Sequence, residues 1–230
     1  GREWSIGTDY SGLVKAKDQT AFAIGLPQAH APGAQWAYNN SGVQTLEAVL
    51  SAATGMSVAE FAQQRLFEPL GMAHTHMSLD GAGNTVLYQG TQSTCEDLAR
   101  FGLLLLHGGR WGDEQIVSAD YVTEATSRSS TKLNVGYGFL FWLNHRGPIG
   151  NPLVATDLSA LSDPATKVGQ LAPGAPRDLF WAIGLGNQIV QVDPGSGTVV
   201  VRLGAGGVRP KPPTFGPVEA SKVVTEAVVR

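Results

Sequence analysis

The sequence predicts an α+β fold, in which a mainly helical part is followed by an antiparallel sheet and a closing helix. Apolar residues at helical spacing dominate the first part of the chain. Short apolar runs separated by turn residues dominate the last third, and strands that follow one another without helices between them favour antiparallel pairing. We therefore expect residues 1–135 to form the helical part and residues 136–230 the sheet with its C-terminal helix.

The predicted helices rest on apolar spacing together with local start and stop signals. Two of them begin at capping boxes, Ser57-Val-Ala-Glu60 and Ser93-Thr-Cys-Glu96. The first of these should end before Pro69, because a proline ring clashes with the preceding helical turn. The helix predicted over 42–53 has Val43, Leu46, Val49 and Leu50 at helical spacing. The other predicted helices cover 18–25, 94–107, 118–125 and 217–229.

The predicted strands lie in the last part of the chain. The aromatic run 137–143 indicates a buried strand, and Asp193-Pro-Gly-Ser-Gly197 indicates a hairpin turn. Residues 145–177 contain several prolines and glycines, which predicts a long loop of the kind tied to function or to substrate enclosure. The remaining predicted strands cover 179–183, 188–192 and 199–203.

The composition excludes several classes of protein. The chain has 230 residues, of which 43% are hydrophobic and 15% are charged, and such a chain buries too much apolar surface to be disordered. The net charge of −3 argues against a nucleic-acid partner. The longest aliphatic run, 103–106, is too short for a membrane span. A single cysteine, Cys95, rules out an internal disulfide and leaves the compartment open.

The first candidate site is Tyr38-Asn39-Asn40, directly before a predicted helix. Residues two apart in a loop can both point into a cleft. A tyrosine hydroxyl beside a cation can act as a base, and an asparagine amide can both donate and accept hydrogen bonds. Tyr38 and Asn40 are therefore the candidate catalytic residues. The alternative, which spacing alone leaves open, is a buried tyrosine beside an asparagine that caps the helix.

The second candidate site is Gly184-Leu-Gly-Asn-Gln188, at the start of a predicted strand. Its glycines allow the backbone to approach a ligand closely, and exposed N–H groups could stabilise an oxyanion. The alternative is a β-bulge or a strand entry. The candidate substrate-binding residues are Gly184, Gly186, Asn187 and Gln188, with Tyr137 and Trp142 as pocket-lining residues that could equally belong to the core.

Two further patterns carry weaker signals. Ser129-Ser-Thr-Lys132 is the only Ser-x-x-Lys in the chain, and on a helix that spacing would let the amine activate the hydroxyl as a nucleophile. Its polar surroundings instead indicate a solvated loop. His74 and His76 have no Cys, Asp or Glu cluster at ligand spacing, so we predict neither a metal site nor a cofactor.

Several sequence segments, taken in order, resemble the motifs of the serine β-lactamase and penicillin-binding-protein-like superfamily. The resemblance points in particular to class C β-lactamases, related esterases and the 6-aminohexanoate-dimer hydrolase type. It covers nearly the whole chain, and although each motif is modest, the ordered set is specific. The phrases are Pro32-Gly-Ala-Gln-Trp-Ala-Tyr-Asn-Asn40-Ser-Gly, Phe67-Glu-Pro-Leu-Gly-Met72 with His74-Thr75, Gln92-Ser-Thr-Cys-Glu-Asp-Leu-Ala-Arg-Phe101 and Gly184-Leu-Gly-Asn-Gln188.

The resemblance implies a β-lactamase/transpeptidase-like fold and a role for each motif. Tyr38 would be the general base that also protonates the leaving group, and Asn40 would orient the substrate amide and a catalytic lysine. Gly186 and Asn187 would supply strand backbone, with the Asn187 N–H as one oxyanion donor. Gly184-Leu-Gly-Asn-Gln188 falls where the family has its third motif, a Lys-Thr-Gly or His-x-Gly element, and it lacks the Lys or His that carboxylate-binding lactamases and peptidases use. Esters or other amides are therefore favoured over β-lactams as small-molecule substrates.

The main departure from the family is the nucleophile. The family's Ser-x-x-Lys lies well upstream of Tyr-x-Asn, and no such motif precedes Tyr38 in this sequence. We therefore expect one incomplete catalytic domain that lacks its N-terminal strands. In the complete serine hydrolase, the nucleophile would come from an upstream segment of the same protein or from an N-terminal chain, and catalysis would proceed through an acyl-enzyme.

Two alternatives stay open. One is a catalytically inactive β-lactamase-like protein that binds or regulates, and the other is a nucleophilic Ser129. The localisation is unknown: the resemblance favours the periplasm or secretion, and the cytoplasm also stays open.

Overall fold

The computed structural model describes residues 3–151, 156–157, 167–204 and 216–228. It confirms the α+β class. Its residues group into two compact units, Gly1–Ser93 with Asn151–Leu158, and Thr94–Gly150 with Ser159–Arg230. The helix predicted over 94–107 thus belongs to the same unit as the sheet. The division at residue 135, where the sequence changes character, stays a prediction.

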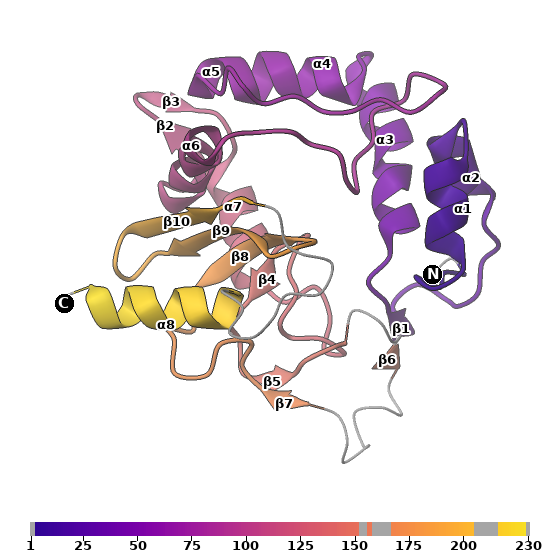
Figure 1. Cartoon of the computed structure of the whole chain (residues 1–230). Helices are drawn as coiled ribbons and strands as arrows, with labels where there is room; N and C mark the ends of the chain where they lie inside the picture. Colours follow the sequence, from indigo (N-terminus) through magenta and orange to yellow (C-terminus); the bar gives the residue numbers. More distant parts are fainter. Residues whose placement is uncertain (1–2, 152–155, 158–166, 205–215, 229–230) are drawn as a thin grey trace. The chain divides into compact units, whose positions relative to one another are not determined.

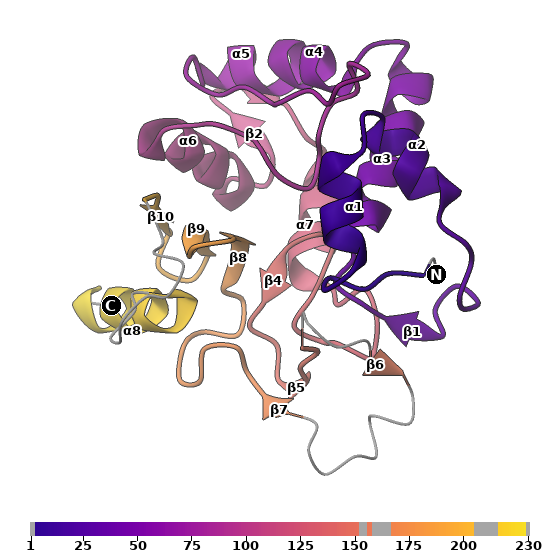
Figure 2. The same ribbon diagram turned by 45° about the vertical axis from the view of Figure 1, so that its right-hand side comes forward.

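The first unit is built mainly from helices (Figures 1 and 2). Helix α2 (Gln19–Gly25) begins where predicted, with the Asp18 side chain accepting from the Ala21 N–H at 2.7 Å. It packs against α3 (Asn40–Thr54), which ends at Gly55 with φ 68°. A short helix that we did not predict, α1 (Asp9–Lys15), precedes them.

Helix α3 buries its polar face rather than its apolar one. Ser41 and Gln44 are fully buried and Glu47 is buried, whereas Leu46 and Val49 are exposed. Gln44 Nε2 donates to Thr20 Oγ1 and to the Thr85 carbonyl, both at 2.9 Å, and Gln44 Oε1 accepts from the Leu87 N–H. Since buried amides need partners, this network fixes which face of α3 points inward.

The helix after Ser57 runs further than predicted. Its capping box is confirmed, but the prediction that it ends before Pro69 is wrong. The chain continues from α4 (Val58–Ala62) through a π-helical turn η1 (Gln63–Phe67) into α5 (Glu68–Leu70). The hydrogen-bond ladder changes its spacing in the π-turn, and Pro69 then lies in the first turn of α5, where no intrahelical N–H bond is required.

The second unit contains a four-stranded antiparallel sheet in the order β10-β9-β8-β4. The predicted strands are confirmed as β8 (Phe180–Gly184), β9 (Gln188–Asp193) and β10 (Thr198–Arg202). The hairpin between β9 and β10 is also as predicted, and Asp193 Oδ1 accepts from the Gly195 N–H at 3.1 Å.

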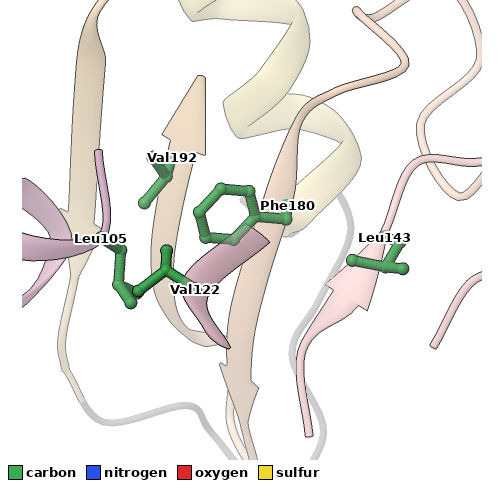
Figure 3. Packing of buried hydrophobic residues seen from close by; sticks show 5 residues of the cluster. All are labelled: Leu105, Val122, Leu143, Phe180 and Val192. Atoms are coloured by element: carbon green, nitrogen blue, oxygen red, sulfur yellow. The ribbon is translucent and has the colours of Figure 1, made fainter. Parts of the chain in front are cut away.

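Helices cover both faces of this sheet (Figure 1). Val192 and Phe180 face α6 (Cys95–Leu106) and α7 (Ala119–Ser127), where they form a buried cluster with Leu105, Val122 and Leu143 (Figure 3). On the opposite face, Gln191 Oε1 accepts from Trp181 Nε1 and from Ser221 Oγ of α8 (Pro217–Ala227), both at 2.9 Å. Strands covered on both sides explain the near-continuous apolar runs in this part of the sequence.

Helix α6 approaches the sheet closely at one glycine. A Cβ on Gly102 would lie 2.4 Å from Cγ1 of Val199 and 3.3 Å from Cγ1 of Val190. The helix therefore packs on β9 and β10 with its backbone.

The predicted start of helix α6 needs a small correction. The N-cap is Thr94, which accepts from the Asp97 N–H, because the Ser93 hydroxyl is hydrogen-bonded to Thr75 Oγ1 at 2.7 Å.

The prediction of one strand over 137–143 is wrong. Only β4 (Trp142–Leu143) is a strand, and the chain folds back on itself so that Tyr137 is bridged to Trp142. The Gly138 N–H donates to the Phe141 carbonyl, and Leu140 adopts φ 65°. A Cβ on Gly138 would lie 2.4 Å from the Ala125 carbonyl oxygen, so this glycine lets the hairpin pass the end of α7.

The remaining described strands are short pairs. They are β1 (Gln35–Trp36) with β6 (Thr156–Asp157), β2 (Arg110–Trp111) with β3 (Glu114–Gln115), and β5 (Gly147–Pro148) with β7 (Val168–Gly169). Parts of the predicted loop 145–177, namely 152–155 and 158–166, lie outside the described residues, as does the last predicted residue of the C-terminal helix, 229.

Within the described ranges, none of the helices combines the length and the apolar character needed to cross a membrane.

Candidate functional site

The Tyr-x-Asn segment joins a short strand pair to a helix. Strand β1 pairs with β6, so the chain just before Tyr38 is held by the ladder Trp36↔Thr156. Tyr38 itself is half-buried, and burial raises its pKa above the ordinary 10.0. With this pKa, Tyr38 is a protonated phenol at neutral pH, which can donate a proton but cannot accept one.

The two asparagines of this segment have different surroundings. Asn39 is the N-cap of α3, and its Oδ1 accepts from the Gly42 N–H at 2.8 Å and from Ser41 Oγ at 2.7 Å. Asn40 is the first helical residue and is half-buried. Among the described residues, no hydrogen bond involves the Asn40 side chain. Because Asn39 caps the helix, the amide of Asn40 is not used as the N-cap.

The glycine-rich segment forms the tight turn between β8 and β9. Gly184 and Gln188 are the last pair of the ladder, and Leu185 between the strands is 94% exposed. Gly186 and Asn187 both have positive φ, 78° and 60°. Glycine and asparagine adopt positive φ more readily than other residues, which explains why they occupy these two positions of the turn.

An arginine that the sequence did not single out holds this turn. Arg202 Nη1 donates to the Asn187 carbonyl at 2.7 Å and to the Gly186 carbonyl at 3.2 Å. In a planar trans peptide the N–H points opposite to the C=O. The N–H of Asn187, which shares a peptide plane with the Gly186 carbonyl, therefore points away from Arg202. No motif around Arg202 signals this role, because it depends on the pairing of strands.

The other predicted substrate-binding residues have visible structural partners. Gln188 Nε2 donates to the Gly204 carbonyl at 2.6 Å, and its Oε1 accepts from the Gly204 N–H at 3.0 Å. Trp142 is buried, and its ring packs edge-on against Tyr137 with centroids 4.8 Å apart. The Gln188 amide thus fixes the chain after β10, and the two aromatic rings form one packed pair in the second unit.

Ser129 is hydrogen-bonded, but not to Lys132. Its Oγ donates to the Val135 carbonyl at 2.6 Å and lies 3.0 Å from Nδ1 of His145. Burial lowers the pKa of His145 below 6.5, so its ring is mostly neutral at pH 7. The hydroxyl proton of Ser129 is engaged with a carbonyl, which does not favour Ser129 as a nucleophile.

Within the described part of the chain, no group of three or more His, Cys, Asp or Glu side chains is arranged so that it could hold a metal ion.

Comparison with known proteins identifies the class. The Beta-lactamase family model matches residues 5–217, and the chain belongs to this family. No curated protein matches the sequence.

Several solved structures share the fold. One is a protein from Bacillus anthracis assigned as a 6-aminohexanoate-dimer hydrolase, with a TM-score of 0.64, 21% identity, and coverage of 89% of this chain and 45% of that chain. Another is assigned as a β-lactamase, from Bacteroides dorei, with a TM-score of 0.58, 20% identity, and coverage of 90% and 62%. A β-lactamase from Mycobacterium bovis has a TM-score of 0.54, 20% identity, and coverage of 76% and 58%.

These matches confirm the β-lactamase-like fold that the motifs indicated. At these identities the likeness concerns the fold alone. The chain spans between 45% and 62% of the length of these three structures, so each of them contains residues that have no counterpart in this sequence.

Proposed function

We propose that this chain is part of a serine hydrolase that cleaves ester or amide bonds through an acyl-enzyme, with the nucleophile in a segment that precedes it. The observation that carries the proposal is the division of tasks at Tyr38-Asn39-Asn40. Asn39 caps the helix, so the amide of Asn40 is not used as the cap, and we assign the catalytic roles to Asn40 and to the phenol of Tyr38.

For Tyr38 to act as a base, the proposed mechanism needs a group that lowers the pKa of its phenol. A phenol raised above 10.0 by burial cannot remove a proton from a serine at neutral pH. A cation beside the phenol would lower this pKa, since a nearby positive charge favours the charged form. A lysine about one helical turn after the nucleophile, as in Ser-x-x-Lys, would supply it. In this mechanism Tyr38 accepts the serine proton during acylation and returns it to the leaving group.

The turn between β8 and β9 is proposed to supply backbone N–H groups for the developing oxyanion. Arg202 holds the carbonyls of Gly186 and Asn187, so the peptide planes of the turn are fixed before any substrate arrives. Fixed N–H dipoles stabilise a developing negative charge without reorganisation cost. Gly184 and Gln188 then anchor the turn within the sheet.

The chemistry of the turn also favours particular substrates. Its residues Leu185, Gly186 and Asn187 carry no positive charge. The nearby guanidinium of Arg202 is bonded to the carbonyls of Gly186 and Asn187, on the side away from the Asn187 N–H, so we assign it to the turn and not to a substrate carboxylate. We therefore propose uncharged esters or amides as substrates, and p-nitrophenyl esters as practical test compounds.

The test is active-site labelling with a fluorophosphonate probe, followed by peptide mapping. The chain alone should remain unlabelled, whereas the protein extended by the residues that precede the chain in its gene should be labelled on a serine upstream of residue 1. In the extended protein, Tyr38→Phe and Asn40→Ala should each lower esterase kcat/KM by about 10²–10⁴-fold. Tyr121→Phe, which changes an exposed tyrosine of α7, is the matched control and should have no effect.

Two results would contradict the proposal. Labelling of Ser129 in the chain alone would place the nucleophile within the chain. An extended protein that binds substrate analogues but is never acylated would instead favour the inactive binding protein.

A further inference from the structure

Arg202 is a half-buried arginine whose guanidinium is bound by backbone carbonyls. Its Nη1 donates to the Asn187 carbonyl at 2.7 Å and to the Gly186 carbonyl at 3.2 Å. Among the described residues, no carboxylate forms an ion pair with Arg202. A guanidinium cannot be deprotonated in a protein, so Arg202 is a permanent cation. Within the described part of the chain, its charge therefore acts on the turn without an acid to cancel it.

The two carbonyls lie on one side of the turn between β8 and β9. A single nitrogen, Arg202 Nη1, contacts both oxygens, so both point toward β10. The N–H of a trans peptide points opposite to its C=O. The peptide group that joins Gly186 to Asn187 therefore has the cation at its oxygen and its N–H on the other side. That N–H is the donor that the proposed function assigns to the oxyanion.

A cation at the oxygen of a peptide group strengthens the N–H of the same group. The hydrogen bond to the C=O draws electrons toward the oxygen, which leaves the N–H proton more positive, and hydrogen bonds joined in a chain polarise one another in this way. A bond from a charged donor is roughly twice as strong as a neutral one, so its polarising effect is larger. A neutral donor at the position of Arg202 could hold the turn but would polarise it less.

We propose that Arg202 is a positioning residue of the hydrolase, whose charge strengthens the Asn187 N–H as the donor to the oxyanion. The inference rests on the proposed function, because the oxyanion forms only in that reaction. A substrate carbonyl is neutral before attack, whereas the tetrahedral intermediate carries a negative charge. The charge of Arg202 therefore acts on the transition state and not on the bound substrate, so it changes kcat and leaves KM unchanged.

The chain contains a matched control for this arrangement. Arg110 also holds the carbonyls of a turn, in the hairpin of β2 and β3. Its Nε donates to the Gly112 carbonyl at 3.2 Å, and its Nη2 donates to the Asp113 carbonyl at 3.4 Å. The proposed reaction gives this hairpin no role. Arg110→Met therefore removes an arginine from a turn outside the proposed site.

The experiment separates the charge of Arg202 from its hydrogen bonds. Arg202→Met removes both, Arg202→Gln keeps a neutral donor, and Arg202→Lys keeps the charge. These variants and Arg110→Met are made in the protein extended by the residues that precede the chain in its gene. For each we measure kcat and KM with p-nitrophenyl acetate, and the Ki of a boronic acid, which binds a serine nucleophile as a tetrahedral anion. Urea unfolding of every variant checks that it folds.

We expect Arg202→Met and Arg202→Gln to lower kcat by about 10–100-fold and to weaken boronic acid binding by the same factor. KM should stay within about twofold of the wild type. Arg202→Lys should recover about tenfold of the lost kcat, and Arg110→Met should match the wild type. An unchanged kcat in Arg202→Met, a loss confined to KM, or equal kcat values for the Gln and Lys variants would overturn the inference.

The same measurements distinguish this inference from the proposed function. An extended wild type that fluorophosphonate never labels would contradict the hydrolase, and the role of Arg202 would fall with it. A labelled and active wild type whose Arg202→Met variant loses no activity would contradict the role of Arg202 alone.

Discussion

Asn39 Oδ1 accepts a hydrogen bond from the Gly42 N–H at 2.8 Å, which makes Asn39, and not its neighbour Asn40, the cap of α3. Replacing Asn39 with alanine leaves this N–H without its partner, so Asn39→Ala should lower the free energy of unfolding by about 1 kcal/mol. Asn40→Ala should leave stability within experimental error and act on catalysis alone. Urea unfolding of both variants checks this contrast, and an equal loss of stability in the two would show that the tasks are not divided.

The buried amide of Gln44 should be one of the most sensitive positions of the first unit. Gln44→Leu keeps the volume similar but strips the hydrogen-bond partners from the Leu87 N–H and the Thr85 carbonyl. We expect a loss of about 1–3 kcal/mol in urea unfolding. Gln64→Leu, at an exposed position of η1, is the matched control and should change stability little. A tolerated Gln44→Leu would mean that these hydrogen bonds do not decide which face of α3 points inward.

Gly102 is predicted to resist even the smallest side chain. The added methyl group of Gly102→Ala would overlap Val199 Cγ1 at 2.4 Å, and Val199 is a short branched residue that cannot swing away. Overpacking of this kind should cost about 1–3 kcal/mol, despite the better helix propensity of alanine. Gly25→Ala in α2 is the control, because nothing lies within 4 Å of its Cβ position, and it should leave stability unchanged or slightly higher.

Tyr88 should make the protein sensitive to alkali. Burial, with smaller contributions from the nearby charges of Tyr10 and Asp80, raises the pKa of Tyr88 to about 12 from the ordinary 10.0. Between these two values the folded protein keeps a proton that the unfolded chain has lost, so its contribution to stability is complete below pH 10.0 and is lost as the pH rises through 12.

Urea midpoints measured across this alkaline range should therefore fall more steeply for the wild type than for Tyr88→Phe. Tyr121→Phe, which removes an exposed tyrosine, should follow the wild type. Parallel curves for the wild type and Tyr88→Phe would refute the raised pKa.

Local signals in the sequence predicted most of the elements. The helix after Ser57 was predicted from its capping box, and the predicted starts at 18 and 118 coincide with N-caps in the structure, where Asp18, Ser57 and Ser118 accept from backbone N–H groups only three residues away. The hairpin at Asp193 is similarly local. The ordered motifs were enough to indicate the family, which the match over residues 5–217 confirms.

What could not be predicted depends on distant partners. Apolar spacing located α3 but not its buried face, because Thr20, Thr85 and Leu87 decide which side points inward. The aromatic run at 137–143 resembled a strand, and its folding back depends on the passage of Gly138 beside Ala125 of α7. In the candidate site, Tyr38 and Asn40 were predicted from their motif and stay a prediction, whereas Arg202 could be recognised only once β10 was paired with β9.

Strand β10 has a consequence for handling the protein. Within the described residues it pairs with β9 on one side, and its core is three consecutive valines, Val199 to Val201, all half-buried. The free edge of such a strand is a template on which another chain can add a strand of its own. We therefore expect concentrated solutions of the chain to aggregate through this edge. A charged residue introduced at Val200 would be the first remedy to try.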